Sequence, residues 1–378
     1  MSELCEVLEA HVTGGLVPGA VGVVARGGAV EVGVVGDVDV EGSARVGRGA
    51  VFRVASVSKP VVAAAVMLLV EDGLLGLDEP VGRWLPELEA AQVVREPGAE
   101  VGDVVAVERA VTVFDLLTFR CGYGFPDDFS LPAVQMLFSE GVQGPPQPQE
   151  VAAADEWLRR LVGVPMLRQP GEAWLYNTGS DIAGVLVARV SGKSLGEFLA
   201  ERIFAPLGMV DTGFFVPADK VGRLVSYYQP GEDGGLKLLD RPEGQWASPP
   251  AFESGSGGLV STVDDMLAFG RMLLGEGPRV LSQESIGLMT TDHLTAEQRE
   301  ASTLFLEGQG WGFGGSVDVA EVDVWNVPGR YGWVGGTGTA FHVVPATGTV
   351  SVLMSQVAMT GPTPPALMRD FWRYAASV

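Results

Sequence analysis

The stretch Val54-Ala-Ser-Val-Ser-Lys-Pro-Val-Val-Ala-Ala-Ala-Val-Met-Leu-Leu-Val70 is almost wholly apolar and contains one charged residue, Lys59. Its length and composition predict a helix over residues 56–72 that ends at Asp72-Gly73. In a helix, a spacing of three residues places Ser56 and Lys59 on the same face, one turn apart. Because burial disfavours the charged form of an amine, we expect the pKa of Lys59 to fall. A partly neutral amine beside a hydroxyl is a base beside a nucleophile.

The spacing of Ser56 and Lys59 is weak evidence by itself, since a serine three residues before a lysine is a common pattern. The alternative is a structural lysine whose amine reaches solvent or pairs with a carboxylate. The apolar surroundings favour the catalytic interpretation, because an unpaired buried ammonium group is costly unless something pairs with it or uses it.

Composition limits the classes of partner and cofactor. The chain has 378 residues, enough for two lobes, and a net charge of −22, which argues against nucleic acid and anionic membrane surfaces. The two cysteines, Cys5 and Cys121, form no ligand cluster with histidines, so we expect no metal and no other cofactor. The acidic N-terminus lacks the features of a signal peptide, and no apolar run reaches membrane-spanning length; a cytoplasmic protein is expected. The oligomeric state is open.

Both ends of the chain are rich in predicted strands. Valine-rich segments at 19–26 and 30–35, separated by Gly-Gly, predict a β-hairpin, and further strands are expected at 320–327, 338–344 and 348–356. Helices are expected at 3–14, 112–119, 151–163, 179–191, 194–204, 260–275 and 364–376, with long loops at 93–110, 122–150 and 228–250.

This distribution predicts an α/β (α+β) protein in which one antiparallel sheet is assembled from both chain ends and flanked by helices. We assign residues 1–77 and 251–378 to a discontinuous sheet-containing lobe. Residues 78–250 are assigned to a mostly helical inserted lobe, with the active site between the two.

Five segments in order resemble the motifs of the serine β-lactamase-related family, which includes class C β-lactamases, D-aminopeptidases, DD-peptidases, family VIII esterases and some acyltransferases. The segments are Phe52–Pro60 with residues 69–86, Leu116-Leu-Thr118 (followed by Phe119 where histidine is usual), Pro170–Gly179, Ser256–Asp265 and Gly332–Gly338. The resemblance covers most of the chain and implies a β-lactamase/transpeptidase-like fold.

The resemblance also implies roles for single residues. Ser56 would be the nucleophile that becomes acylated, Lys59 would accept its proton, and Tyr176 would be the second member of the acid/base pair. The oxyanion hole would consist of the backbone N–H groups of Ser56 and Gly336. A phenol has an ordinary pKa near ~10, so Tyr176 is expected to need the nearby charge of Lys59 to lower it.

Two motifs depart from the family pattern. The tyrosine motif normally has asparagine two residues after the tyrosine, whereas here that residue is Thr178 and Asn177 comes one place early. The third motif normally carries Lys-Thr-Gly or His-x-Gly, and here it reads Trp333-Val-Gly335. We expect Asn177, Thr178, Trp333 and Gly335 to contact substrate.

The cation that would meet a substrate carboxylate is therefore missing, and whether Arg330 or Arg120 replaces it stays open. Trp-x-Gly at this place is similar to esterase members of the family. A large aromatic residue in a pocket wall favours apolar acyl groups. Because Trp333 is flanked by glycines, a role in the core is poorly supported.

The function predicted from these features is a serine hydrolase that works through an acyl-enzyme, with a carboxylesterase on small apolar esters favoured. The alternatives on the same scaffold are a β-lactamase, a D-aminopeptidase or other amide hydrolase, and an acyltransferase. An alternative from another class is a non-catalytic, penicillin-binding-like sensor protein.

Overall fold

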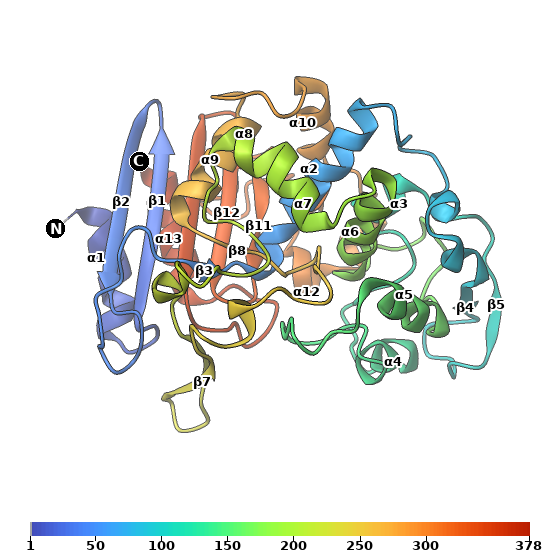
Figure 1. Ribbon diagram of the computed structural model, residues 1–378. Helices are drawn as coiled ribbons and strands as arrows, with labels where there is room; N and C mark the ends of the chain where they lie inside the picture. Colours follow the sequence, from blue (N-terminus) through green and yellow to red (C-terminus); the bar gives the residue numbers. More distant parts are fainter. Residues whose placement is uncertain (1) are drawn as a thin grey trace.

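The computed structural model describes residues 2–378, and its main feature is a seven-stranded antiparallel sheet in the order β2-β1-β13-β12-β11-β10-β9 (Figure 1). The strands are β1 (Gly19–Arg26), β2 (Ala29–Gly36), β9 (Gly310–Trp311), β10 (Ser316–Val317), β11 (Tyr331–Gly335), β12 (Thr339–Val344) and β13 (Thr349–Ser355). The β1–β2 hairpin comes from the N-terminal end of the chain, and it joins the C-terminal strands where β1 pairs with β13. The expected sheet assembled from both chain ends is confirmed.

The valine-rich sequence of β1 reflects burial on both faces of the sheet. Val21 and Val23 belong to the larger hydrophobic core, whereas Ala20 and Val24 belong to a second core on the opposite face. Successive residues of a strand point to opposite faces, so a strand buried on both sides needs no polar alternation.

Helices cover the two faces of the sheet. The terminal helices α1 (Glu3–Thr13) and α13 (Ala366–Ser377) pack on one face (Figure 1). Helix α9 (Val263–Leu273) packs on the other face against β1, β12 and β13, and α2 (Ser58–Glu71) contacts β11.

The helix-rich part of the chain lies beside the sheet, on the far side of α2 (Figure 1). Its helix α6 (Thr178–Ser191) packs against α2 and thereby connects the two regions.

The remaining helices are α3 (Val113–Leu117), α4 (Pro132–Ser139), α5 (Ala154–Gly163), α7 (Leu195–Leu199), the π-helical turn Ala200–Phe204, α8 (Ala205–Leu207), α10 (Gln283–Met289), α11 (Ala296–Glu300) and α12 (Thr303–Leu306). Short strand pairs are β3 (Phe52–Arg53) with β8 (Val260–Ser261), β4 (Gln92–Val94) with β5 (Val104–Ala106), and β6 (Tyr227–Pro230) with β7 (Leu236–Asp240).

Several predicted elements need correction. The strand predicted at 320–327 is wrong, because this segment is a loop in which Val322 and Val324 are 65% and 68% exposed. Its alternating sequence has no sheet face to bury against. The loops predicted at 93–110, 122–150 and 228–250 contain the β4–β5 hairpin, α4 and the β6–β7 hairpin, respectively. The lobe boundaries proposed above stay a prediction.

Among residues 2–378, no helix has both the length and the apolar character that crossing a bilayer would require.

The contact between α9 and the sheet gives a stability prediction. A Cβ at Gly270 would lie 2.5 Å from a methyl carbon of Val350 and 3.1 Å from the Phe341 ring. We expect Gly270→Ala to lower the free energy of unfolding, since overpacking costs about 1–3 kcal/mol and the gain in helix propensity is only about 1 kcal/mol. The matched control is Gly287→Ala in α10, where a Cβ would meet no atom within 4 Å. This substitution should raise the free energy of unfolding. Urea denaturation of both variants measures the difference, and a Gly270→Ala protein as stable as the control would contradict this packing.

Candidate active site

Ser56 lies in a single 3-10 turn, Ala55–Val57, between strand β3 and the start of α2. The preceding residue, Ala55, has φ +43°, which is unusual for a residue with a side chain and places strain directly before the serine. The α-helix itself begins two residues later than predicted, at Ser58. The serine side chain is half-buried, and it accepts a hydrogen bond from Lys59 Nζ at 2.8 Å. The spacing of three residues therefore does bring the amine to the hydroxyl.

Lys59 is fully buried and is held by three groups. Besides Ser56, its amine donates to the carbonyl oxygen of Ser256 at 2.6 Å, and it lies 4.6 Å from the centre of the Tyr176 ring. Burial lowers the pKa of Lys59 from its ordinary value to about 7, although the negative charge of Asp181 offsets part of the shift. A large fraction of the amine is thus neutral near pH 7, in agreement with the expectation from the sequence.

Asp181, which the sequence analysis did not identify, organises the support of Lys59. This carboxylate lies in the first turn of α6 and is only 3% exposed. Its Oδ1 accepts from the Ser256 N–H at 2.9 Å and from the Ser254 hydroxyl at 2.7 Å, and its Oδ2 accepts from Gln143 at 3.2 Å. The carboxylate thereby fixes the loop whose carbonyl holds the amine. The sequence did contain a signal for Asp181, because it is an acidic residue among apolar residues in the helix predicted at 179–191.

The hydroxyl of Tyr176 accepts a hydrogen bond from the indole N–H of Trp333 at 2.6 Å. Reciprocal backbone hydrogen bonds of 2.9 Å to Phe125 fix its main chain. Burial raises the pKa of Tyr176 to about 12, and hydrogen bonds with Ser56 and Trp333 lower it only in part. The expectation that Lys59 would lower this pKa is wrong, because burial outweighs the favourable contacts.

Trp333 is a core residue as well as a neighbour of Tyr176. It is 5% exposed and packs edge-to-face on Trp311 with ring centres 4.8 Å apart. The expectation that it lies outside the core is therefore wrong: the flanking glycines do not prevent burial, because other rings surround it. The aromatic cluster consists of Phe119, Trp174, Tyr176, Phe305, Trp311 and Trp333.

Two members of the aromatic cluster bear on the sequence analysis. Phe119, which stands where the family usually has histidine, packs with its ring centre 4.8 Å from that of Trp311. Phe305 is 4.7 Å from the ring centre of Tyr176, and no sequence motif pointed to it. The site is thus more aromatic than its motifs suggested.

The end of β11 runs alongside the turn that carries Ser56. A Cβ at Gly335 would collide with the carbonyl oxygen of Val54 and with Thr339 Oγ1, so only glycine allows this close approach. The next residue, Gly336, is exposed, and a Cβ there would meet no atom within 4 Å. Its carbonyl accepts from the Met359 N–H at 2.8 Å.

The two residues after Tyr176 have different surroundings. Asn177 has φ +87°, and its side-chain amide donates to Gln143 Oε1. Thr178 is fully buried at the start of α6, and its hydroxyl has no hydrogen-bond partner within residues 2–378. The substrate-binding roles of Asn177, Thr178, Trp333 and Gly335 stay predictions.

Each candidate arginine has a partner away from Ser56. Arg330 is 4% exposed and lies 3.6 Å from Asp318, and Arg120 donates to Thr118 at 3.0 Å. No hydrogen bond or ion pair joins either arginine to Ser56, Lys59 or Tyr176 in the part of the chain that the structure describes.

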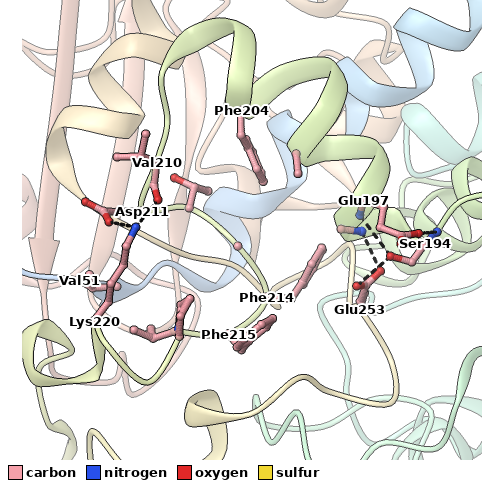
Figure 2. Close-up of a pocket in the computed structure, with 16 residues that line it drawn as sticks. Val51, Ser194, Glu197, Phe204, Val210, Asp211, Phe214, Phe215, Lys220 and Glu253 are labelled. Atoms are coloured by element: carbon pink, nitrogen blue, oxygen red, sulfur yellow. Dashed lines mark hydrogen bonds and ion pairs between the residues drawn. The ribbon is translucent and has the colours of Figure 1, made fainter.

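A cavity of about 340 Å³ lies apart from this site, between α7 and the loop 210–217 (Figure 2). Ser56 does not line it, and its polar groups are paired within the protein: Glu253 accepts from the Gly196 N–H at 2.7 Å, and Lys220 donates to Asp211 at 2.7 Å. No group of three or more His, Cys, Asp or Glu side chains suited to a metal ion occurs among the described residues.

The chain is similar to several known proteins. The chain is 36% identical over 359 residues to Rv1367c of Mycobacterium tuberculosis, covering 90% of this chain and 86% of that protein. It is 31% identical over 376 residues to Esterase EstB of Burkholderia gladioli, covering 92% of this chain and 88% of that protein. Among solved structures, EstCE1, described as a hydrolase with promiscuous acyltransferase activity, superimposes with a TM-score of 0.80 at 24% identity, covering 99% and 97% of the two chains.

The fold is therefore the β-lactamase/transpeptidase-like fold expected from the sequence. A family model described as Beta-lactamase matches residues 6–370, nearly the whole chain. This match, together with the similarity to EstB, shows that the protein belongs to the Beta-lactamase family.

Proposed function

We propose that this protein is a serine hydrolase that uses Ser56 as an acylated nucleophile, and more specifically a carboxylesterase for small apolar esters. The observation that carries the proposal is the 2.8 Å hydrogen bond between Ser56 and a fully buried Lys59 whose pKa is about 7. An amine that is partly neutral at neutral pH can accept the serine proton, which an ordinary lysine cannot do.

In the acylation step, Ser56 Oγ attacks the ester carbonyl carbon while Lys59 takes its proton. The negative charge on the carbonyl oxygen is stabilised by the N–H groups of Ser56 and the exposed Gly336. The C–O bond to the alcohol then breaks. Water repeats the sequence on the acyl-enzyme and releases the carboxylic acid.

Tyr176 serves as a proton donor in this scheme. With a pKa of about 12 it stays protonated at neutral pH, so its hydroxyl can protonate the departing alkoxide. The proton that Lys59 received from Ser56 then restores the phenol. Trp333 holds the hydroxyl in place by donating to its oxygen, which leaves the phenol proton available.

The preference for apolar esters rests on the surroundings of Tyr176. Aromatic rings, among them Phe305 and Trp333, pack around this tyrosine, and both candidate arginines are engaged elsewhere. Such walls favour alkyl or aryl acyl groups over substrates with a carboxylate. Similar proteins named Esterase EstB and Lovastatin esterase support ester hydrolysis.

Removal of the nucleophile tests the assignment. We expect Ser56→Ala to reduce kcat/KM for p-nitrophenyl butyrate by more than about 10³-fold, because no other group can form the acyl-enzyme. Wild-type protein should hydrolyse this ester much faster than the β-lactam nitrocefin. Unchanged turnover in Ser56→Ala would disprove the role of the serine, and a preference for nitrocefin would disprove the substrate class.

The pH profile tests Lys59 as the base and Asp181 as a positioning residue. Lys59 is protonated below its pKa of about 7 and cannot then accept a proton, so kcat/KM should rise as pH increases through 7. Asp181→Asn retains acceptors for Ser254 and Ser256 but removes the charge that raises the Lys59 pKa, so the rise should move to lower pH. A variant that loses activity with an unmoved profile would indicate a merely structural carboxylate.

The bond from Trp333 to Tyr176 can be tested with a matched pair of variants. Trp333→Phe removes the N–H that holds the phenol and should lower kcat about tenfold, as expected for the loss of about 1.4 kcal/mol. The control is Trp311→Phe in the same cluster, whose indole N–H has no hydrogen-bond partner within residues 2–378. Steady-state kinetics of both variants measure this difference. Equal losses of kcat would show that the aromatic packing matters and that the hydrogen bond to Tyr176 does not.

A further inference from the structure

The two backbone N–H groups proposed for the oxyanion hole belong to different parts of the fold. Ser56 lies in the 3-10 turn after β3, whereas Gly336 lies in the turn between β11 and β12. Two N–H groups stabilise one oxygen well only if their separation and directions are fixed before the reaction. The β11–β12 turn must therefore be held at a constant position relative to the segment that carries Ser56.

Two buried threonines connect these parts, one in the β11–β12 turn and one at the start of β12. Thr337 is 1% exposed, and its hydroxyl donates to the carbonyl oxygen of Arg53. Thr339 is fully buried, and its hydroxyl donates to the carbonyl oxygen of Val54 at 3.0 Å. The two acceptors are successive carbonyl groups that lie directly before the turn with Ser56.

The Val54 carbonyl is the point at which the two parts meet. Besides the Thr339 hydroxyl, it accepts from the Val57 N–H at 3.1 Å, a bond that closes the 3-10 turn containing Ser56. A Cβ at Gly335 would collide with both the Val54 oxygen and Thr339 Oγ1. The missing side chain of Gly335 thus leaves the space in which this hydroxyl reaches the carbonyl.

The opposite side of the β11–β12 turn is fixed by other hydrogen bonds. The Gly336 carbonyl accepts from the Met359 N–H at 2.8 Å, and the Gly338 carbonyl accepts from the Ser355 hydroxyl at 2.8 Å. The turn itself is closed by the Gly338 N–H, which donates to the Gly335 carbonyl at 2.9 Å. The turn is therefore rigid, and its two threonine hydroxyls carry this rigidity across to the segment before Ser56.

We propose that Thr337 and Thr339 are positioning residues of the oxyanion hole, whose hydroxyls set the distance between the N–H groups of Ser56 and Gly336. The inference rests on the proposed acyl-enzyme function. Both side chains are buried, so they act through the backbone and not on the substrate itself.

Thr337→Val and Thr339→Val test the proposal, because valine keeps the branched shape of threonine and lacks the hydroxyl. For p-nitrophenyl butyrate, each variant should lower kcat about tenfold and change KM less than about twofold, since the interaction that is weakened forms in the transition state. Steady-state kinetics measure both constants.

A thionoester reports the oxyanion hole more directly. In this substrate sulfur replaces the carbonyl oxygen of p-nitrophenyl butyrate, and sulfur is larger and a weaker hydrogen-bond acceptor. Well-placed N–H groups therefore favour the oxygen ester, and the ratio of the two kcat/KM values should fall at least about threefold in each valine variant. A variant that is only partly folded would lower both rates equally and leave this ratio unchanged.

The matched control is Thr290→Val at the end of α10, whose hydroxyl also donates to a backbone carbonyl, that of Ile286 at 2.9 Å. This variant should keep the wild-type ratio, and so should Thr337→Ser, which retains the hydroxyl. If one of the two valine variants does not fold, the other decides.

A wild-type ratio in a folded valine variant, or an equal fall of the ratio in Thr290→Val, would overturn the proposal. If Ser56→Ala abolishes turnover at the same time, only the role of the threonines fails and the proposed function stands. Turnover that survives Ser56→Ala would overturn the proposed function and this inference with it.

Discussion

The arrangement of the candidate site depends on keeping the amine of Lys59 buried. Lys59 is fully buried, and within residues 2–378 only Ser56 and the Ser256 carbonyl accept its hydrogen bonds. Burial of a charge is unfavourable, and here the burial lowers the pKa of Lys59 to about 7 rather than being fully offset by a paired carboxylate. Burial of Lys59 therefore has two consequences: it lowers the stability of the folded protein, and it makes the amine a base near neutral pH.

Asp181 and the aromatic cluster both help to hold the buried amine of Lys59 in place. Asp181 is near enough to influence the amine but accepts its hydrogen bonds from Ser254, Ser256 and Gln143 rather than from Lys59. A direct ion pair would hold the lysine charged and remove its ability to accept a proton. The aromatic cluster packs around Tyr176, and its Trp333 donates a hydrogen bond that holds the phenol.

Local features of the fold and the site were predictable from the sequence. The hairpin of β1 and β2 follows from valine-rich runs around Gly-Gly, and the Ser56–Lys59 contact follows from a spacing of three residues. The segment 320–327 has an alternating pattern as well, yet it forms a loop, because pairing depends on a neighbouring strand that the sequence does not reveal. Ordered motifs indicated Tyr176, but its raised pKa reflects burial by residues distant in the chain. The bond from Trp333 to Tyr176 spans 157 positions, and the bond from Ser256 to Asp181 spans 75. No local pattern encodes such contacts.

The central claim is that Ser56 becomes acylated. Intact-protein mass spectrometry after acid quenching, during turnover of p-nitrophenyl butyrate, tests it directly. The account predicts one added butyryl group, which peptide mapping places on Ser56. An unmodified protein under turnover, or a butyryl group on another residue, would contradict it.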